Sequence, residues 1–385
     1  MTLEIMNVKL NLKNPSKMSP LKYFYLLGIS LSFLVSCKNN VEKGTAPIAR
    51  KVVPKIAITK DQFNEIAKLS EYPFFEGKIA DLKPAENVYE YKLNNALFSD
   101  YSHKKRFIYF PKGKKMFYRP EGVMEFDVGS IIIKNFYYPS DFRNPEGEKK
   151  IIETRLLIKE QNQSWKTLSY VWNEEQTDAF VNIIGGKTPV SWIDHNGKSQ
   201  NLIYAIPNQT LCKSCHMLGK EISPIGPIAG QLNRNNIYEG MVHDQLEYFV
   251  QKEVLKGLPK KEKRPRFAIW NQEDSGTLDD RAKAYLHINC AHCHNDLGPA
   301  KNSGLNLTYH EKNKRRRGVY KPPIAAGKGS GNLKFSIVPG EPENSIMIYR
   351  YKSTDPGIMM PEVGRKSIHK EGLALMEEYI HSLEM

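Results

Sequence analysis

The sequence predicts an α+β fold in which a β-rich part comes first and an all-α part comes last. Between residues 106 and 206, short runs of β-branched and aromatic residues are separated by Gly, Pro and Asn, a pattern typical of an antiparallel sheet. After residue 276, apolar residues recur three and four positions apart, which favours helices. The charged, proline-bearing stretch 258–266 lies between the two patterns and predicts a domain boundary near residue 265.

The same patterns predict the individual elements. The expected strands cover residues 106–110, 130–138, 152–159, 166–172, 181–184 and 201–206. Amphipathic helices are expected over 245–255 and, near the C-terminus, over 373–383. A further helix should begin after Thr277, a capping residue followed by two acids in the first turn, and should run to Cys290.

Composition excludes several classes of protein. Hydrophobic residues make up 40% of the 385 residues, so the chain can bury a sizeable core and is not disordered throughout. Lys and Arg number 56 against 42 Asp and Glu, and this net charge of +14 favours acidic partners or anionic membrane surfaces. The five cysteines are an odd number, which excludes a disulfide framework as the main scaffold.

The N-terminal segment has the features of an export signal. Lys22 precedes an apolar run over residues 23–35, which is shorter than the roughly 20 apolar residues that a membrane-spanning helix needs. Residues 34–37, Leu-Val-Ser-Cys, resemble the lipobox of bacterial lipoproteins, in which the cysteine is acylated and becomes the first residue. We expect a signal peptide over 1–36, lipidation of Cys37 and a flexible tether over 37–60; an ordinary signal peptide with an incidental cysteine is the alternative.

The other four cysteines lie in two C-x-x-C-H motifs, made by Cys212, Cys215 and His216 and by Cys290, Cys293 and His294. Cysteines at this spacing can form thioethers with both vinyl groups of one haem, while the next histidine binds the iron. A reactive dithiol would not need the histidines. A zinc ribbon expects its two halves ~15–20 residues apart, far closer than these motifs, and chance is the third alternative. The motifs therefore predict two covalently attached haems c, with His216 and His294 as proximal iron ligands.

The C-terminal part resembles class I cytochromes c. The resemblance rests on the helix expected before Cys290 and on a downstream loop, Asp-Pro-Gly-Ile-Met-Met-Pro-Glu, over residues 355–362. It implies that Met360 is the sixth ligand of the second haem, with Met359 as the fallback, and that the last helix packs on the helix before Cys290. Core packing is the other role open to this methionine pair. Residues 266–385 would then form an all-α, class I cytochrome c-like domain that carries the second haem.

The β-rich part, residues 61–265, would carry the first haem. A sheet followed by a C-x-x-C-H motif weakly resembles the beta-type cytochromes c-prime, in which the distal side of the haem is apolar and the iron lacks a strong sixth protein ligand. Several residues of this chain could nevertheless supply a sixth ligand, and the sequence assigns none of them: His103, His195, Met241, His243 and His287.

The whole chain resembles a family of bacterial lipid-anchored dihaem c-type cytochromes, on residues 97–101, 105–108 and 170–179 and on the methionine loop. The resemblance implies export to the cell envelope, as a periplasmic or outer-membrane-associated lipoprotein, and redox transfer, but it names no substrate. We expect an electron carrier rather than an enzyme. The alternative is a redox enzyme or gas-binding protein with an open distal site at the first haem and the second haem as electron relay.

The expected partners are an acidic redox protein and, through the lipid, a membrane. The basic run 312–317 is either a solvated loop or a docking patch for that acidic partner. Export argues against nucleic acid as a partner.

Overall fold

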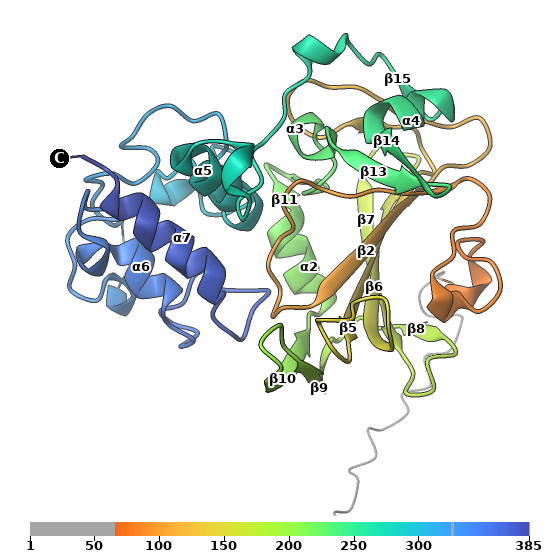
Figure 1. Cartoon of the computed structure of the whole chain (residues 1–385), viewed down its shortest axis with the longest axis horizontal. Helices are drawn as coiled ribbons and strands as arrows, with labels where there is room; N and C mark the ends of the chain where they lie inside the picture. The colour runs from red at the N-terminus through yellow and green to blue at the C-terminus, as the bar shows by residue number, and fades with distance from the viewer. Residues whose placement is uncertain (1–65, 325–326, 385) are drawn as a thin grey trace, which may run out of the picture. The chain divides into compact units, whose positions relative to one another are not determined.

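A computed structural model describes residues 66–324 and 327–384, all of which belong to one compact unit. The expected signal peptide, tether and lipidated Cys37 lie outside the described residues. The α+β prediction is confirmed: the N-terminal and middle region is β-rich, and the C-terminal region is more helical (Figure 1). Within the described ranges, no helix combines the length and the apolar character that crossing a membrane requires.

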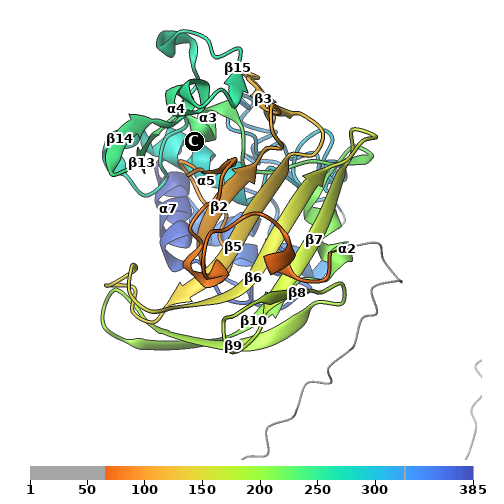
Figure 2. The same ribbon diagram turned by 90° about the vertical axis from the view of Figure 1, so that its right-hand side faces the viewer.

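The main sheet has six strands, and every neighbouring pair is antiparallel (Figure 2). In spatial order the strands are β1 (Val88–Glu90), β2 (His103–Tyr109), β5 (Ile131–Pro139), β6 (Lys149–Lys159), β7 (Trp165–Trp172) and β8 (Ala179–Val181). The four long central strands, β2, β5, β6 and β7, confirm the predicted strands over 106–172 to within a few residues. The strand predicted over 181–184 is wrong for the most part, because β8 ends at Val181.

Shorter strands surround this sheet. The strand predicted over 201–206 exists, but it forms a separate hairpin instead of joining the main sheet. The small sheets consist of β9 (Gly186–Ile193) with β10 (Ser199–Ile206), β11 (Met217–Leu218) with β12 (Glu221–Ile222), β13 (Asn235–Tyr238) with β14 (Met241–Asp244), and β15 (Leu255–Lys256) with β3 (Met116–Phe117) and β4 (Glu125–Phe126).

The sheet packs apolar side chains on both faces, because successive residues of a strand point to opposite sides. On one face, Ile132 and Leu157 join a core with α3 (Ala229–Leu232) and α4 (Gln245–Gln251). On the other face, Ile133 and Leu156 pack with residues from the segment 69–82.

Helix α4 is shorter than the predicted 245–255, since the chain leaves the helix at Lys252 and then forms β15.

The first C-x-x-C-H motif lies on α2 (Gln209–His216), which begins shortly after β10 ends at Ile206. The sequence predicted that the motif follows this strand, but it predicted no helix there. The Asn208 side chain caps this helix by accepting a hydrogen bond of 2.8 Å from the Leu211 backbone N–H. Helix α2 packs against β7, so the motif is held against the main sheet.

The helical region consists of α5 (Leu278–Asn289), α6 (Ile346–Tyr351) and α7 (Lys370–His381), joined by long segments with short 3-10 turns. Thr277 and Asp280 form a capping box at the start of α5, and Cys290 is its C-cap residue, as the sequence predicted. Helix α7 packs on α5, which confirms the predicted contact between the last helix and the helix before Cys290.

Candidate functional site

A cavity of about 310 Å³ lies between the main sheet, α2 and the helical region. The sheet contributes Lys134 and Arg155, α2 contributes all three residues of the first motif, and the helical region contributes residues from α5 and from the segment 361–369. Burial of mixed apolar and charged side chains around one hollow is typical of a ligand site.

Helix α2 presents the donor atoms of the first motif to this cavity. Cys212 is buried, and burial raises the pKa of both the Cys212 and the Cys215 thiol. His216 Nδ1 lies 2.8 Å from the Ser223 carbonyl oxygen. A carbonyl only accepts, so Nδ1 carries the proton and Nε2 keeps a free lone pair, the tautomer that binds a metal. Burial, with a smaller effect of the Lys134 charge, lowers the pKa of His216 to about 3, which keeps the ring neutral.

The second motif follows α5. Burial raises the pKa of the Cys290 and Cys293 thiols to about 12 and, together with the charge of Arg350, lowers the pKa of His294 to about 4. His294 Nδ1 is 2.9 Å from Ser303 Oγ, so this ring is also oriented through Nδ1. These three side chains do not line the 310 Å³ cavity, but Asn289 and His292 beside them do.

The two motifs are neighbours in space although they are far apart in the sequence. The Gly219 backbone N–H, just after the first motif, donates to the Leu297 carbonyl, just after the second, at 2.8 Å. Cys215 is close enough to Cys293 to contribute, after burial, to raising the pKa of that thiol. No sequence pattern predicted this proximity.

The predicted methionine loop lies close to the second motif. The Met360 N–H donates to the Arg350 carbonyl at 3.2 Å, and Arg350 Nε donates to the Ile358 carbonyl at 2.8 Å. Arg350 is also the residue whose charge acts on His294. Met359 is 2% exposed and packs inside the protein, whereas Met360 is only partly buried. Ligation by Met360 stays a prediction.

Three basic residues form a row across one face of the main sheet. Arg106 on β2 is in register with Lys134 on β5, and Lys134 is in register with Arg155 on β6. Paired residues of antiparallel strands lie on the same face, so the three cations are adjacent. Arg155 donates to the fully buried Glu153 carboxylate at 2.5 Å. Burial, and then the charges of Arg155 and Arg106, lower the pKa of Lys134 to about 7. Lys134 and Arg155 line the cavity, whereas Arg106 does not, so the wall formed by these two residues suits an anionic group.

None of the five residues considered as a sixth ligand of the first haem lines the cavity. Met241 is 60% exposed, and His287 Nδ1 accepts a hydrogen bond from the Tyr309 N–H at 3.1 Å. His103 and His195 both pack against Phe142. The His243 ring packs at a tilt against the rings of Tyr238 and Tyr248.

The histidines that do line the cavity with His216 are His292 and His369, and sequence reasoning missed both. For His292 a signal was available, because it is the second variable residue of the second C-x-x-C-H motif. For His369 no pattern singled it out. Within 66–324 and 327–384, no group of three or more His, Cys, Asp and Glu side chains is arranged to hold a metal ion.

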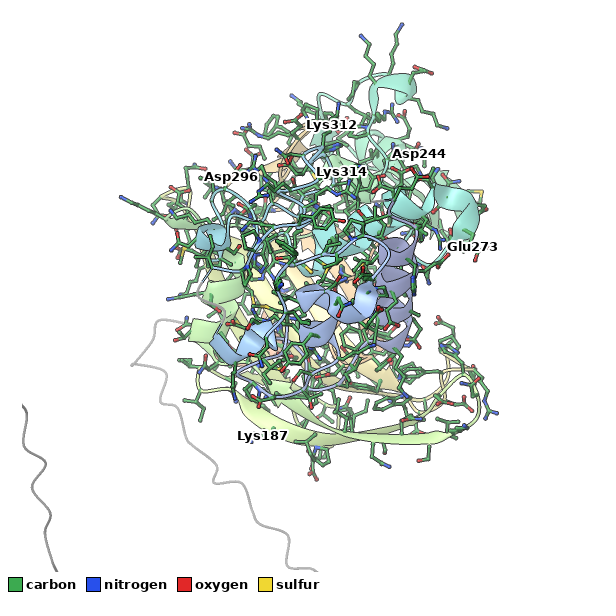
Figure 3. All side chains as sticks on the ribbon, turned by 90° about the vertical axis from the view of Figure 1, so that its left-hand side faces the viewer. Lys187, Asp244, Glu273, Asp296, Lys312 and Lys314 are labelled. Carbon is green, nitrogen blue, oxygen red and sulfur yellow. The ribbon has the colours of Figure 1, made fainter. Side chains whose placement is uncertain are left out.

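The basic run 312–317 divides into two kinds of residue. Lys312 and Lys314, labelled in Figure 3, are exposed. Arg316 pairs with Asp296 and Glu311, and the buried Arg317 contacts Asp279 and the Tyr379 hydroxyl. The end of the run therefore holds the helical region together.

Comparison of the chain with protein-family models, curated proteins and solved structures finds no match.

Proposed function

We propose that this protein is a dihaem c-type cytochrome that transfers electrons in the cell envelope. The observation that carries the proposal is the cavity, which combines the two thiols and the neutral histidine of one C-x-x-C-H motif with the partly buried Lys134 and Arg155 of the main sheet. These groups match the chemistry of a haem: thiols for its vinyl groups, an imidazole nitrogen for its iron and cations for its propionates.

The second haem would be attached to Cys290 and Cys293, with His294 as proximal ligand and Met360 as sixth ligand. Support comes from the succession of α5, the motif, the methionine loop and α7 packed on α5, the order that resembles class I cytochromes c. His294 is oriented through Nδ1 as His216 is, although its partner is a serine hydroxyl instead of a carbonyl.

Haem iron supplies one-electron chemistry by alternating between the ferric and ferrous states. This chain would hold two such groups close together, since a hydrogen bond from the Gly219 N–H to the Leu297 carbonyl joins the segments that follow the two motifs. A reduced partner would deliver an electron to one site, and an oxidised partner would remove it from the other. Residues 1–36 contain four lysines and one glutamate, so the chain from Cys37 onward has a net charge of +11, which favours acidic partners. A lipid on Cys37 would keep the protein at a membrane.

An electron count tests this function. The full chain, exported from a bacterium that attaches haem c, is purified, reduced with dithionite and titrated anaerobically with a one-electron oxidant. We expect two electrons per chain and an unchanged spectrum after a full cycle of oxidation and reduction. Absence of covalent haem, or a bound zinc ion in its place, would refute the proposal.

Paired variants assign the electrons to the two motifs. Changing both Cys212 and Cys215 to Ala, or both Cys290 and Cys293, should leave one electron per chain in each case. If only one pair lowers the count, the protein is a monohaem cytochrome. A ferric site that is high-spin and binds nitric oxide in the unmodified protein would favour the redox enzyme or gas-binding alternative over the carrier.

A further inference from the structure

We propose that His292, a residue inside the second C-x-x-C-H motif, is the sixth ligand of the first haem iron. The inference rests on the proposed function, because it needs a haem on Cys212 and Cys215. It goes further by assigning bis-histidine coordination to that haem and by making one motif a part of both haem sites.

The position of His292 is the first argument. Its side chain lines the same cavity as His216, although the two residues belong to different regions of the chain. A haem with two histidine ligands needs two imidazoles on one cavity, and His216 and His292 meet this condition.

The bonding state of His292 is the second argument. Its Nδ1 is buried and has no hydrogen-bond partner in the described part of the chain. A buried polar atom without a partner is unfavourable, and such atoms in proteins often bind a ligand or an ion.

The other histidine of the cavity is already engaged. His369 Nδ1 is 2.8 Å from the Tyr285 hydroxyl, and its Nε2 is 3.6 Å from the Glu371 carboxylate. Its ring is also stacked on Phe98, with ring centroids 4.2 Å apart. His369 therefore has a structural role, and coordination would break its contacts.

The remaining donors of the cavity are weaker candidates. Burial raises the pKa of the Tyr204, Tyr285 and Tyr351 hydroxyls, which therefore keep their protons and bind iron poorly. Lys134 is the one competitor whose amine is partly neutral near pH 7, and the experiment includes it.

Coordination by His292 would connect the two redox centres directly. His292 is bonded in sequence to Cys293, the residue proposed to hold the second haem. An electron could then pass from one haem to the other through a covalent path of two residues and one metal–nitrogen bond.

Near-infrared magnetic circular dichroism of the oxidised protein tests the inference, because bis-histidine and histidine–methionine haems give separate bands. We expect both bands in the unmodified protein. In His292→Ala the bis-histidine band should disappear, a high-spin signal should replace it, and added imidazole should restore the low-spin state. The covalent haem count should remain two per chain.

His369→Gln is the matched control and should keep both low-spin bands. A His292→Ala protein that keeps its bis-histidine band, or a loss of that band in Lys134→Met, would overturn the inference while leaving the dihaem proposal in place. A preparation without covalent haem would refute both proposals, so the two failures are distinguishable.

Discussion

At the scale of single residues, Lys134 indicates which kind of ligand the cavity would bind. It lies on a central strand between two arginines, and one buried carboxylate, that of Glu153, accompanies these three cations. Burying a charge without a partner costs several kcal/mol. An anionic ligand would remove that cost, and the propionates of a haem are anionic groups of suitable size.

The titration of Lys134 gives a testable consequence for the haem-free protein. Its pKa is lowered from 10.5 to about 7 in the folded state. Between these two pH values the unfolded chain binds the extra proton, so folding stability should rise with pH, by up to about 1.4 kcal/mol per pH unit. Urea unfolding at pH 7 and pH 9 measures the slope.

Two comparisons identify the source of that slope. Lys134→Met should lower the slope but not remove it, because burial also lowers the pKa of the Lys104 amine. Lys187→Met, at an exposed position of β9, should leave the slope unchanged. In the haem-bound protein the slope should be smaller, because a propionate would favour the charged amine. An equal slope in Lys134→Met would contradict this explanation.

At the scale of elements, α5 is the helix that carries the second motif at its end. The Asp280 N–H donates to Thr277 Oγ1 at 3.1 Å, and the Thr277 N–H donates back to the Asp280 carboxylate at 3.3 Å. This capping box fixes where the helix starts, and its C-cap is Cys290.

Removal of the cap should destabilise the protein. Thr277→Ala loses the hydroxyl that satisfies a free backbone N–H, so the free energy of unfolding should fall by about 1 kcal/mol. Thr277→Ser keeps the hydroxyl, so its free energy of unfolding should stay close to that of the unmodified protein. The urea midpoints of both variants and of the unmodified protein provide the measurement. Equal midpoints for Thr277→Ala and the unmodified protein would show that the cap contributes nothing.

The long elements were predictable from the sequence and the short ones were not. Strands β5, β6 and β7 contain uninterrupted β-branched and aromatic runs, and α5 has both a capping signal and helical spacing. Strands such as β3 and β11 have only two residues, too few for any alternation to be visible. Their positions depend on tertiary pairing instead of local preference.

For the site, the chemistry was visible in the sequence but the arrangement was not. The two C-x-x-C-H motifs were plain, whereas the row formed by Arg106, Lys134 and Arg155 depends on strand register. The placement of His292 in the cavity of the first motif depends on contacts between distant segments. The absence of His103 and His195 from that cavity has the same cause.

At the scale of the whole molecule, the segment 94–101 connects the β-rich and helical regions. The Phe98 N–H donates to the Asn289 side chain at 2.8 Å. Asp100, which is 2% exposed, accepts hydrogen bonds from the backbone N–H groups of Lys366 and Ser367, both at 2.7 Å, and from the Ser367 hydroxyl at 2.8 Å. One carboxylate therefore holds the segment that follows the methionine loop.

Loss of this carboxylate should weaken the junction. Asp100→Ala leaves three donors without an acceptor, and we expect the free energy of unfolding to fall by about 3 kcal/mol. Asp100→Asn keeps one acceptor oxygen and should lose less, while Asp274→Ala, at an exposed position, should change little. An unchanged urea midpoint in Asp100→Ala would contradict the role assigned to this residue.

The central claim is that four cysteines hold two haems. Its most direct test is the intact mass of the denatured, exported protein, combined with a thiol titration of the same sample. The account predicts the mass of the polypeptide with its lipid plus two haems, and no reactive thiol. A mass without haem, or four titratable thiols in the denatured chain, would contradict it.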